Sequence, residues 1–298
     1  MAPRIAITGA GGFIGQAVAR ALVETGFGGG VTLFDRAFGC AQPFPVVEGD
    51  LCDPHMMAEV TQWADCVIHL VALPGAAAAA DPDLSESINL HLPRALIAGL
   101  AGKRMIYASS VAALGSDLGS EVNDETQPAP NSVYGKHKHL TELAFADGVR
   151  SGGLAGLAIR LPGVVARPQA SAGFGSAFLS DVFHAARAGV RYTMPVAPDA
   201  TSWLISASAC AANLVQAALS DANEAEAVNM PALTVTIADL LAELAKAHDV
   251  SGIDYNEQPS IRQVFGSHPP LTAARGEHLG MRADSDLAAL VESVLADV

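Results

Sequence analysis

The sequence is poor in positive charge and in cysteine, and it has no long apolar run. Its 17 Lys and Arg face 31 Asp and Glu, for a net charge of −14. This balance argues against nucleic acid or an anionic membrane as partner, because both need clustered positive charge. The most apolar stretch, residues 66–80, is interrupted by His69, Pro74 and Gly75 and falls short of the ~20 residues of a membrane span.

The four cysteines form no CxxC pair, and the nine histidines include no HExxH motif. Neither a disulfide framework nor a metal site is therefore predicted. Unpaired thiols are typical of a reducing compartment. We expect a cytoplasmic protein with no metal, no nucleic-acid partner and no membrane partner.

The first half of the sequence alternates short apolar segments with helical ones. Segments that are apolar throughout are typical of parallel strands covered by helices on both faces. We expect an α/β fold with a Rossmann-type, doubly wound parallel sheet. Its strands are predicted at residues 4–8, 31–35, 46–47, 66–71, 104–108 and 154–161, and its helices at residues 12–25, 55–64, 84–100 and 132–151.

A glycine-rich segment, residues 8–15, joins the first predicted strand to the first predicted helix. Gly9 permits a tight turn, Gly12 lets the backbone approach a pyrophosphate, and Gly15 lets the helix pack on the strand. The helix N-terminus would present N–H groups and the positive end of its dipole to the phosphates. The segment therefore predicts a dinucleotide-binding loop.

Two acidic residues follow the next two strands. Asp35 lies 20 residues after Gly15, where a carboxylate accepts hydrogen bonds from the adenosine ribose and repels a 2′-phosphate. NAD is thus favoured over NADP, although the neighbouring Arg36 acts in the opposite sense. Asp50 and Leu51 are placed to meet the adenine, and Asp50 could equally form a turn.

After Pro162 the pattern changes, and helices dominate. We expect residues 1–165 to form an NAD-binding Rossmann domain and residues 166–298 a smaller, mostly helical substrate-binding region, with about residues 201–229 packing back onto the first domain. Short strands are predicted near Trp203 and Val228. Helices are predicted at residues 176–188, 207–219, 237–247 and 285–296, and residues 76–80 are expected to be a loop or the start of a helix.

Tyr134 and Lys138 are four residues apart on a predicted helix and therefore share one face. A phenol has a pKa of ~10, and a nearby ammonium together with an oxidised nicotinamide favours the phenolate. The tyrosine can then take a hydroxyl proton as hydride leaves the same carbon. Ser109 and Ser110 end the preceding strand. One of them can hold the substrate oxygen in line with Tyr134, while the other caps the turn.

Taken together, the motifs resemble those of the extended short-chain dehydrogenase/reductase family, which includes NAD-dependent epimerases and dehydratases. The similarity runs from about residue 4 to residue 165. It is carried by TGAGGFIG, GDLCD, HLVA, SINLH, YASSVAALG, YGKHK and RLP.

The resemblance implies roles for individual residues. The family's catalytic serine stands five residues before the glycine that closes its strand-end motif, which here is Gly115, and thus at Ser110. Ser110, Tyr134 and Lys138 would be catalytic, and the first two would contact substrate. Helices 84–100 and 132–151 would form a homodimer interface, although both could instead face the sheet. The expected NAD-binding residues are Gly9, Gly12, Phe13, Ile14, Gly15, Asp35, Arg36, Asp50, Leu51, Val71, Ala72, Asn89, Tyr134, Lys138 and Pro162.

The second half is similar to the D-erythronate dehydrogenase branch of this family, which oxidises the C2 hydroxyl of a four-carbon sugar acid with NAD. Residues 194–206, 227–244 and 260–287 carry the similarity. Two stretches depart from the branch: Thr201-Ser202 stand where an arginine is expected, and residues 169–172 where an asparagine is expected. Both touch the expected substrate pocket.

A small anionic sugar acid would need a cation or converging N–H groups. Arg160, Arg167, Arg191 and Arg262 are candidates, and each also suits a structural role. The sequence thus predicts NAD-dependent oxidation of such an acid, D-erythronate to 2-oxo-tetronate being favoured. A nucleotide-sugar epimerase or dehydratase that retains its NAD is the alternative, and a non-catalytic binding protein is a third class.

Overall fold

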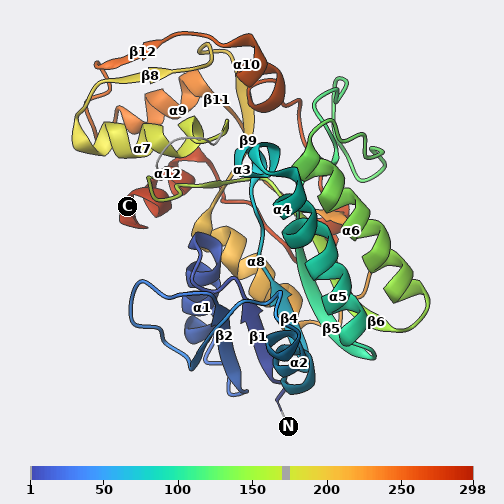
Figure 1. Cartoon of the computed structure of the whole chain (residues 1–298). Coiled ribbons are helices and arrows are strands. Elements are labelled where there is room, and N and C mark those ends of the chain that lie inside the picture. The colour runs from blue at the N-terminus through green and yellow to red at the C-terminus, as the bar shows by residue number, and fades with distance from the viewer. Residues whose placement is uncertain (1, 170–174, 298) are drawn as a thin grey trace.

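The computed structural model describes residues 2–169 and 175–297 (Figure 1). Within them, a seven-stranded sheet has the order β10-β6-β5-β4-β1-β2-β3, and every pairing between its neighbours is parallel. Its strands are β1 (Ile5–Thr8), β2 (Val31–Asp35), β3 (Val46–Glu48), β4 (Cys66–His69), β5 (Lys103–Ser110), β6 (Leu154–Leu161) and β10 (Val228–Asn229).

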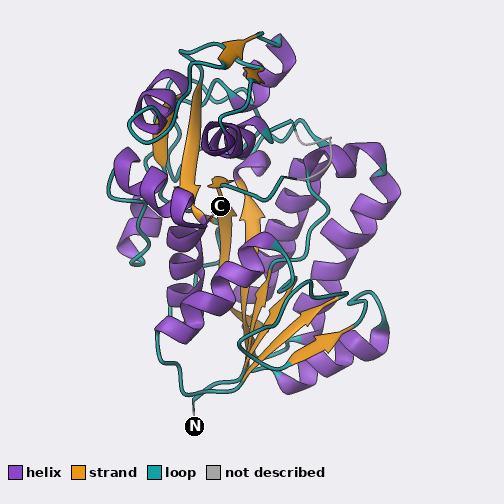
Figure 2. Cartoon of the chain, turned by 90° about the vertical axis from the view of Figure 1, so that its left-hand side faces the viewer, coloured by secondary structure: helices purple, strands orange, loops and turns teal. Residues whose placement is uncertain are grey.

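Helices cover both faces of this sheet (Figure 2). One face carries α1 (Phe13–Glu24) and α8 (Ala207–Leu219); the other carries α2 (Pro54–Trp63), α5 (Leu92–Gly99) and α6 (Val133–Arg150). The side chains of β1 alternate between the two faces. Ile5 and Ile7 pack in the core under α1 and α8, whereas Ala6 packs in the core under α2, α5 and α6. The predicted Rossmann-type fold is confirmed.

The predicted helix at residues 84–100 is present, with a π-helical turn inside it. It consists of α4 (Pro82–Glu86), the π-helical turn (Ser87–His91) and α5, which follow one another without a gap. Pro93 has no N–H to donate to the carbonyl of Asn89, four residues earlier. That carbonyl accepts the Thr141 hydroxyl at 3.1 Å instead. The predicted strand at residues 66–71 ends at His69, and residues 75–80 form the short helix α3 (Gly75–Ala80).

The rest of the chain lies above the sheet in Figure 1. Its core is formed by side chains such as Phe183, Leu204, Leu240 and Leu290. Strands β7 (Gly163–Val165), β9 (Thr201–Ser206) and β11 (Leu233–Thr236) form one small sheet, and β8 (Tyr192–Met194) pairs with β12 (Ile253–Tyr255). The helices are α7 (Phe178–Ala188), α9 (Ile237–Leu244), α10 (Pro259–Phe265), α11 (Ala274–His278) and α12 (Leu287–Asp297).

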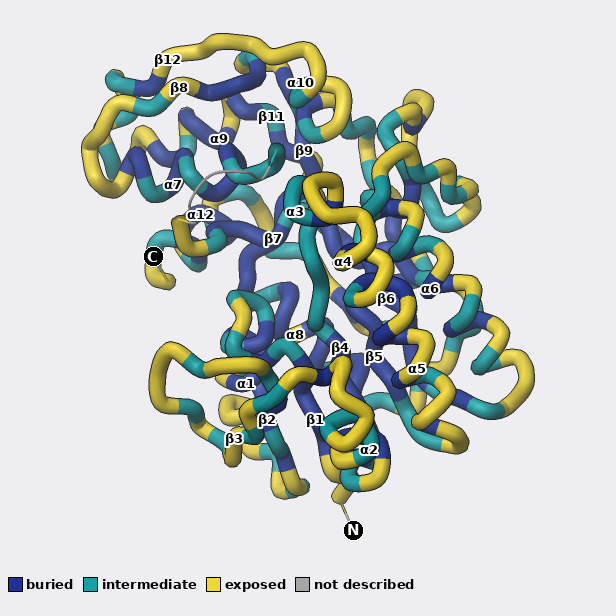
Figure 3. The backbone as a smooth tube through the Cα atoms, viewed as in Figure 1, coloured by how far each residue is buried: buried dark blue, intermediate teal, exposed yellow. Residues whose placement is uncertain are grey.

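Burial is concentrated in the central strands, whereas the outer loops and much of α4 are exposed (Figure 3). In the described part of the chain, no helix is both long enough and apolar enough to cross a bilayer.

Candidate active site

The predicted site residues gather at one edge of the seven-stranded sheet. Because the strands are parallel, their carboxyl ends coincide: β1 ends at Thr8, β2 at Asp35, β5 at Ser110 and β6 at Leu161. The strand order reverses between β1 and β4. In open α/β sheets, ligands bind outside the carboxyl ends at such a reversal.

The glycine loop is closely packed against its surroundings. Gly9 has a φ of +79°, and a Cβ there would lie 2.8 Å from the Val71 nitrogen. A Cβ on Gly15 would lie 2.3 Å from the Gly9 carbonyl oxygen, so only glycine allows α1 to sit on this turn. Gly12 precedes α1, and no side chain caps the helix. The first N–H groups of α1 are therefore left for an anion.

Phe13 and Ile14, the next two residues of the loop, are half-buried and pack against the core between the sheet, α1 and α8. Their side chains therefore anchor the start of α1. Any contact that they make with a cofactor stays a prediction.

Asp35 lies directly beside the glycine loop. Its Oδ2 accepts a hydrogen bond from the Gly11 N–H at 2.8 Å, and its Oδ1 accepts one from the Arg36 N–H at 2.6 Å. Asp35 is half-buried and Arg36 is exposed. The Asp35 carboxylate thus lies beside the position that the ribose would occupy if a pyrophosphate were bound at the glycine loop.

Asp50 forms a turn, one of its two predicted roles. Its Oδ1 accepts a hydrogen bond from the Cys52 N–H at 2.9 Å, and the residue is exposed. Leu51 is buried in the core beside Phe34. The adenine contacts of Asp50 and Leu51 stay predictions.

The segment after β4 is fixed by Asn89. The Asn89 Oδ1 accepts a hydrogen bond from the Leu73 N–H, and its Nδ2 donates to the Leu73 carbonyl, both at 2.8 Å. Val71 and Ala72, which precede Leu73, are half-buried next to the glycine loop. Pro162 is buried between β6 and β7. Asn89 therefore shapes the wall of the site by holding backbone.

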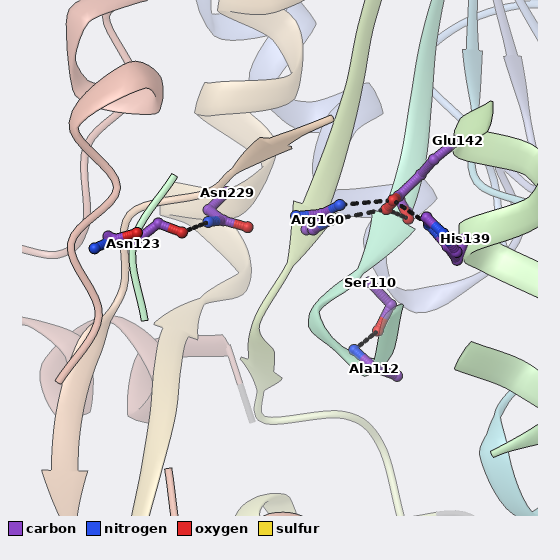
Figure 4. A network of polar contacts seen from close by, with 8 residues as sticks. Ser110, Ala112, Asn123, His139, Glu142, Arg160 and Asn229 are labelled. Atoms are coloured by element: carbon purple, nitrogen blue, oxygen red, sulfur yellow. Dashed lines mark hydrogen bonds and ion pairs between the residues drawn. The ribbon is translucent and has the colours of Figure 1, made fainter. Parts of the chain in front are cut away.

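The two serines at the end of β5 differ in environment. Ser109 is buried, and its hydroxyl donates to Glu142 Oε1 at 2.5 Å. Ser110 is half-buried, and its Oγ accepts a hydrogen bond from the Ala112 N–H at 3.2 Å (Figure 4). The Ser110 hydroxyl also lowers the pKa of Tyr134. Ser110 is thus the serine whose hydroxyl acts on the tyrosine, whereas the Ser109 hydroxyl is bound to Glu142.

Helix α6 brings Tyr134 and Lys138 to this edge. It begins after Ser132, whose Oγ accepts the Gly135 N–H at 3.0 Å. Lys138 is buried, and its Nζ donates to the Ala108 carbonyl at 2.6 Å. That Nζ lies 5.6 Å from the centre of the Tyr134 ring and 4.7 Å from that of Tyr107. The structure therefore brings Ser110, Tyr134 and Lys138 together.

Burial dominates the proton affinities of this group. It raises the pKa of Tyr134 to about 12, against the opposing effects of the Ser110 hydroxyl and the positive charge of Arg167. It lowers the pKa of Lys138 to about 7, against the opposing charge of Glu142. The predicted lowering of the phenol pKa by Lys138 together with an oxidised nicotinamide stays a prediction, because this pKa of Tyr134 is that of the protein residues alone. Desolvation outweighs the nearby charges, and Arg167 is the cation that acts against it.

A buried ion pair, which the sequence analysis missed, supports the site from behind. Glu142 accepts hydrogen bonds from Arg160 Nε at 3.0 Å and Arg160 Nη2 at 2.8 Å, and His139 Nδ1 lies 3.4 Å from its Oε2 (Figure 4). Glu142 and Arg160 are 4% and 6% exposed, so both charges are desolvated. Glu142 stands one helical turn after Lys138. That spacing was the available signal, because it places a carboxylate next to the lysine.

The four candidate arginines fall into different environments. Arg160 is used by Glu142, and Arg262 pairs with Asp199 and Glu257. Arg191 is exposed and directly precedes β8 in the sequence. Arg167 is half-buried, and its charge acts on Tyr134. Arg167 is thus the one of these four that the structure links to Tyr134.

The structure describes one of the two stretches that differ from the D-erythronate dehydrogenase branch and only part of the other. Thr201 begins β9, and its hydroxyl donates to the His268 carbonyl at 2.7 Å. Ser202 is buried and hydrogen-bonds the Phe265 carbonyl. Both therefore anchor the C-terminal segment. In the other stretch, residues 170–172 lie outside the described residues.

Other features lie apart from this edge. A surface hollow of about 570 Å³ opens between α1 and α8, lined by residues such as Ala21, Thr25 and Leu219. Cys40 and Cys52 are exposed, whereas Cys66 and Cys210 are buried. Among the described residues, no three side chains of His, Cys, Asp or Glu are grouped to hold a metal ion.

Comparisons with known proteins agree with this arrangement. Residues 5–230 match the model of the NAD-dependent epimerase/dehydratase family. The chain is 30% identical to D-erythronate dehydrogenase from Cupriavidus necator and 26% identical to that from Haemophilus influenzae, with 98% of both chains covered in each case.

Among solved structures, a nucleoside-diphosphate-sugar epimerase from Agrobacterium tumefaciens superposes with a TM-score of 0.88 at 25% identity, covering 99% of this chain and 94% of that one. The holo form of a GalE-like L-threonine dehydrogenase from C. necator has a TM-score of 0.87 at 23% identity, with 99% of each chain covered. The second likeness concerns the fold alone.

Proposed function

The chain belongs to the NAD-dependent epimerase/dehydratase family, and from that premise we propose that it oxidises the C2 hydroxyl of a small sugar acid with NAD. D-erythronate, which would give 2-oxo-tetronate, is the favoured substrate. The observation that carries the proposal is the grouping of Ser110, Tyr134 and Lys138 at the sheet edge that also holds the glycine loop. The similarity to two D-erythronate dehydrogenases extends over nearly the whole chain.

The residues at this edge fit a dinucleotide. The glycine loop leaves no room for side chains at Gly9 and Gly15, and the start of α1 has no side-chain cap. Both features suit a pyrophosphate against backbone N–H groups. Asp35 would receive the ribose hydroxyls, and its negative charge disfavours the extra phosphate of NADP. When bound, the oxidised nicotinamide supplies the acceptor for hydride and a positive charge near the phenol.

The protein's own residues would handle the proton. Tyr134 accepts the proton of the C2 hydroxyl, which Ser110 orients by a hydrogen bond. Because burial raises the phenol pKa to about 12, the base needs positive charge beside it. Arg167 provides such charge from this chain. Glu142 opposes the loss of the Lys138 proton, since its charge favours the ammonium.

An epimerase or dehydratase is the second candidate. It is favoured by the 25% identity to a solved nucleoside-diphosphate-sugar epimerase. Such an enzyme returns hydride to its substrate and releases no net NADH. The two candidates therefore differ in an observable product.

The decisive assay follows NADH absorbance at 340 nm while the protein is incubated with NAD and a panel of three- to six-carbon aldonic acids. We expect NADH to accumulate with D-erythronate. Absence of NADH with every acid would exclude the dehydrogenase. Tightly bound NAD that copurifies with the protein, without NADH release, would favour the epimerase.

We also propose a homodimer in which α4, α5 and α6 of two copies pack together. These helices leave Leu84, Leu140 and Leu143 between 45% and 49% exposed, and large apolar side chains grouped on one face are typical of an interface. Sedimentation velocity should give twice the mass of one chain. Leu140→Glu combined with Leu143→Glu should reduce it to that of a monomer.

A further inference from the structure

The segment that follows β4 forms one wall of the site and packs directly on the glycine loop. The Leu70 N–H donates to the Thr8 carbonyl at 2.9 Å, and a Cβ on Gly9 would lie 2.8 Å from the Val71 nitrogen. There is thus no free space between this segment and the turn before α1. A shift of the segment would change the space in which a dinucleotide is expected to bind.

Asn89 holds this segment and is itself held from two sides. Its amide forms two hydrogen bonds with the backbone of Leu73, both at 2.8 Å, and its Nδ2 also donates to Ser85 Oγ at 3.0 Å. Its own backbone carbonyl accepts the Thr141 hydroxyl at 3.1 Å. Ser85 and Asn89 are buried, at 0% and 1% exposed. Both N–H groups of the amide and its oxygen are therefore used, which fixes the orientation of the amide.

His137 extends this chain of contacts to α6. Its Nδ1 lies 2.9 Å from Ser85 Oγ, so the serine hydroxyl can donate to the ring while its oxygen accepts from Asn89. His137 directly precedes Lys138, and Thr141 lies one helical turn after His137 on the same face of α6. The helix that carries the lysine therefore contacts Asn89 twice, through Ser85 at the side chain and directly at the backbone.

We infer that Ser85 and His137 are positioning residues of the cofactor site. They hold the Asn89 amide against Leu73 and thereby keep residues 70–73 in place beside the glycine loop. The inference rests on the proposed cofactor, NAD, and not on the identity of the acid. If the chain is interrupted, a buried N–H of Asn89 loses its acceptor and the amide is free to turn. Cofactor binding then weakens while the fold remains.

The test is the affinity for NADH, measured by fluorescence titration with no acid present. Ser85→Ala and His137→Leu should each weaken NADH binding by about 2- to 10-fold, the range expected for one hydrogen bond. His137→Asn keeps a hydrogen-bonding group on Cγ, where Nδ1 stands, and should restore most of the affinity. His91→Leu is the matched control. His91 is exposed and pairs with Glu86, so its replacement should leave the affinity unchanged.

Two further readouts separate positioning from a general loss of structure. Because both substitutions interrupt the same chain, the double variant should bind NADH no more weakly than the weaker single variant. With an acid that the wild type oxidises, the KM for NAD should rise while kcat stays close to that of the wild type.

Four results would overturn the inference: wild-type NADH affinity in both single variants, additive losses in the double variant, no recovery in His137→Asn, or failure of the wild-type protein to bind NADH. If the variants bind NADH in the expected order and no acid is oxidised, the inference is supported and the proposed function alone fails.

Discussion

Replacing Arg160 by methionine tests whether the buried ion pair behind the site holds it together. The substitution leaves the Glu142 carboxylate in a site where it is 4% exposed, with Ser109 and His139 as its remaining side-chain hydrogen-bond partners among the described residues. Removing one partner of a buried pair costs about 3–5 kcal/mol of unfolding free energy. For 298 residues, with an unfolding entropy of about 2.1 cal/mol/K per residue, that corresponds to a Tm decrease of roughly 5–8 °C.

The pH dependence of this effect has a defined sign. The contacts with Arg160, His139 and Ser109 hold the pKa of Glu142 below its usual value, so the wild-type contribution is present above pH ~4.3 and is lost as the pH falls through the lowered folded-state pKa. In Arg160→Met, the unpaired carboxylate should have a raised pKa. The difference in stability between the two proteins should therefore narrow as the pH falls from 7 to 5.

Urea denaturation followed by circular dichroism measures the free energies. Arg4→Met is the matched control, because Arg4 forms a similar two-point pair with Asp65 on the surface and exposed pairs contribute little. The double variant Arg160→Met/Glu142→Gln should be more stable than the sum of its single effects predicts. A loss below about 1 kcal/mol in Arg160→Met, or additive single effects, would refute this reasoning.

Three further predictions concern the cofactor loop and the buried lysine. Asp35→Ala should raise the kcat/KM ratio of NADP to NAD at least about tenfold, a shift of 1.4 kcal/mol, whereas Asp50→Ala, in an exposed turn, should leave it unchanged. Gly15→Ala places a Cβ 2.3 Å from the Gly9 carbonyl and should abolish NADH binding measured by fluorescence; retained affinity would show that the loop can relax. Because burial lowers the pKa of Lys138 to about 7, the unfolded chain binds more protons between pH 7 and 10, so wild-type stability should rise across that window. Lys138→Met should remove this rise, and an identical pH profile in urea titrations would contradict the lysine's lowered pKa.

Local patterns in the sequence predicted the fold well, because β1, β2, β4 and β6 are mostly apolar and the glycine loop leaves no room for side chains at Gly9 and Gly15. The proximity of Tyr134 and Lys138 could also be predicted, because residues four apart on a helix share one face. The π-helical turn inside the helix at residues 84–100 was not predicted, although Pro93 marks it, because helical periodicity continues through the turn.

Contacts between distant segments could not be predicted. Glu142 lies on α6 and Arg160 on β6. The β5–β6 pairing places Arg160 opposite Ser109, and the packing of α6 brings Glu142 to both. The raised pKa of Tyr134 results from burial by surrounding segments, which the spacing of Tyr134 and Lys138 does not reveal. Likewise, the sequence could not separate Arg167 from three other arginines, because its effect on the pKa of Tyr134 depends on the folded chain.

The central claim is that the Tyr134 oxygen takes the proton from the substrate hydroxyl. The most direct test is the rate of NADH formation from D-erythronate by Tyr134→Phe, measured alongside its affinity for NADH. The substitution removes one oxygen from a half-buried ring, so the fold and the cofactor site should remain. We expect NADH affinity close to that of the wild type and a kcat lower by at least about 100-fold. A variant that binds NADH normally and turns over at the wild-type rate would contradict the claim.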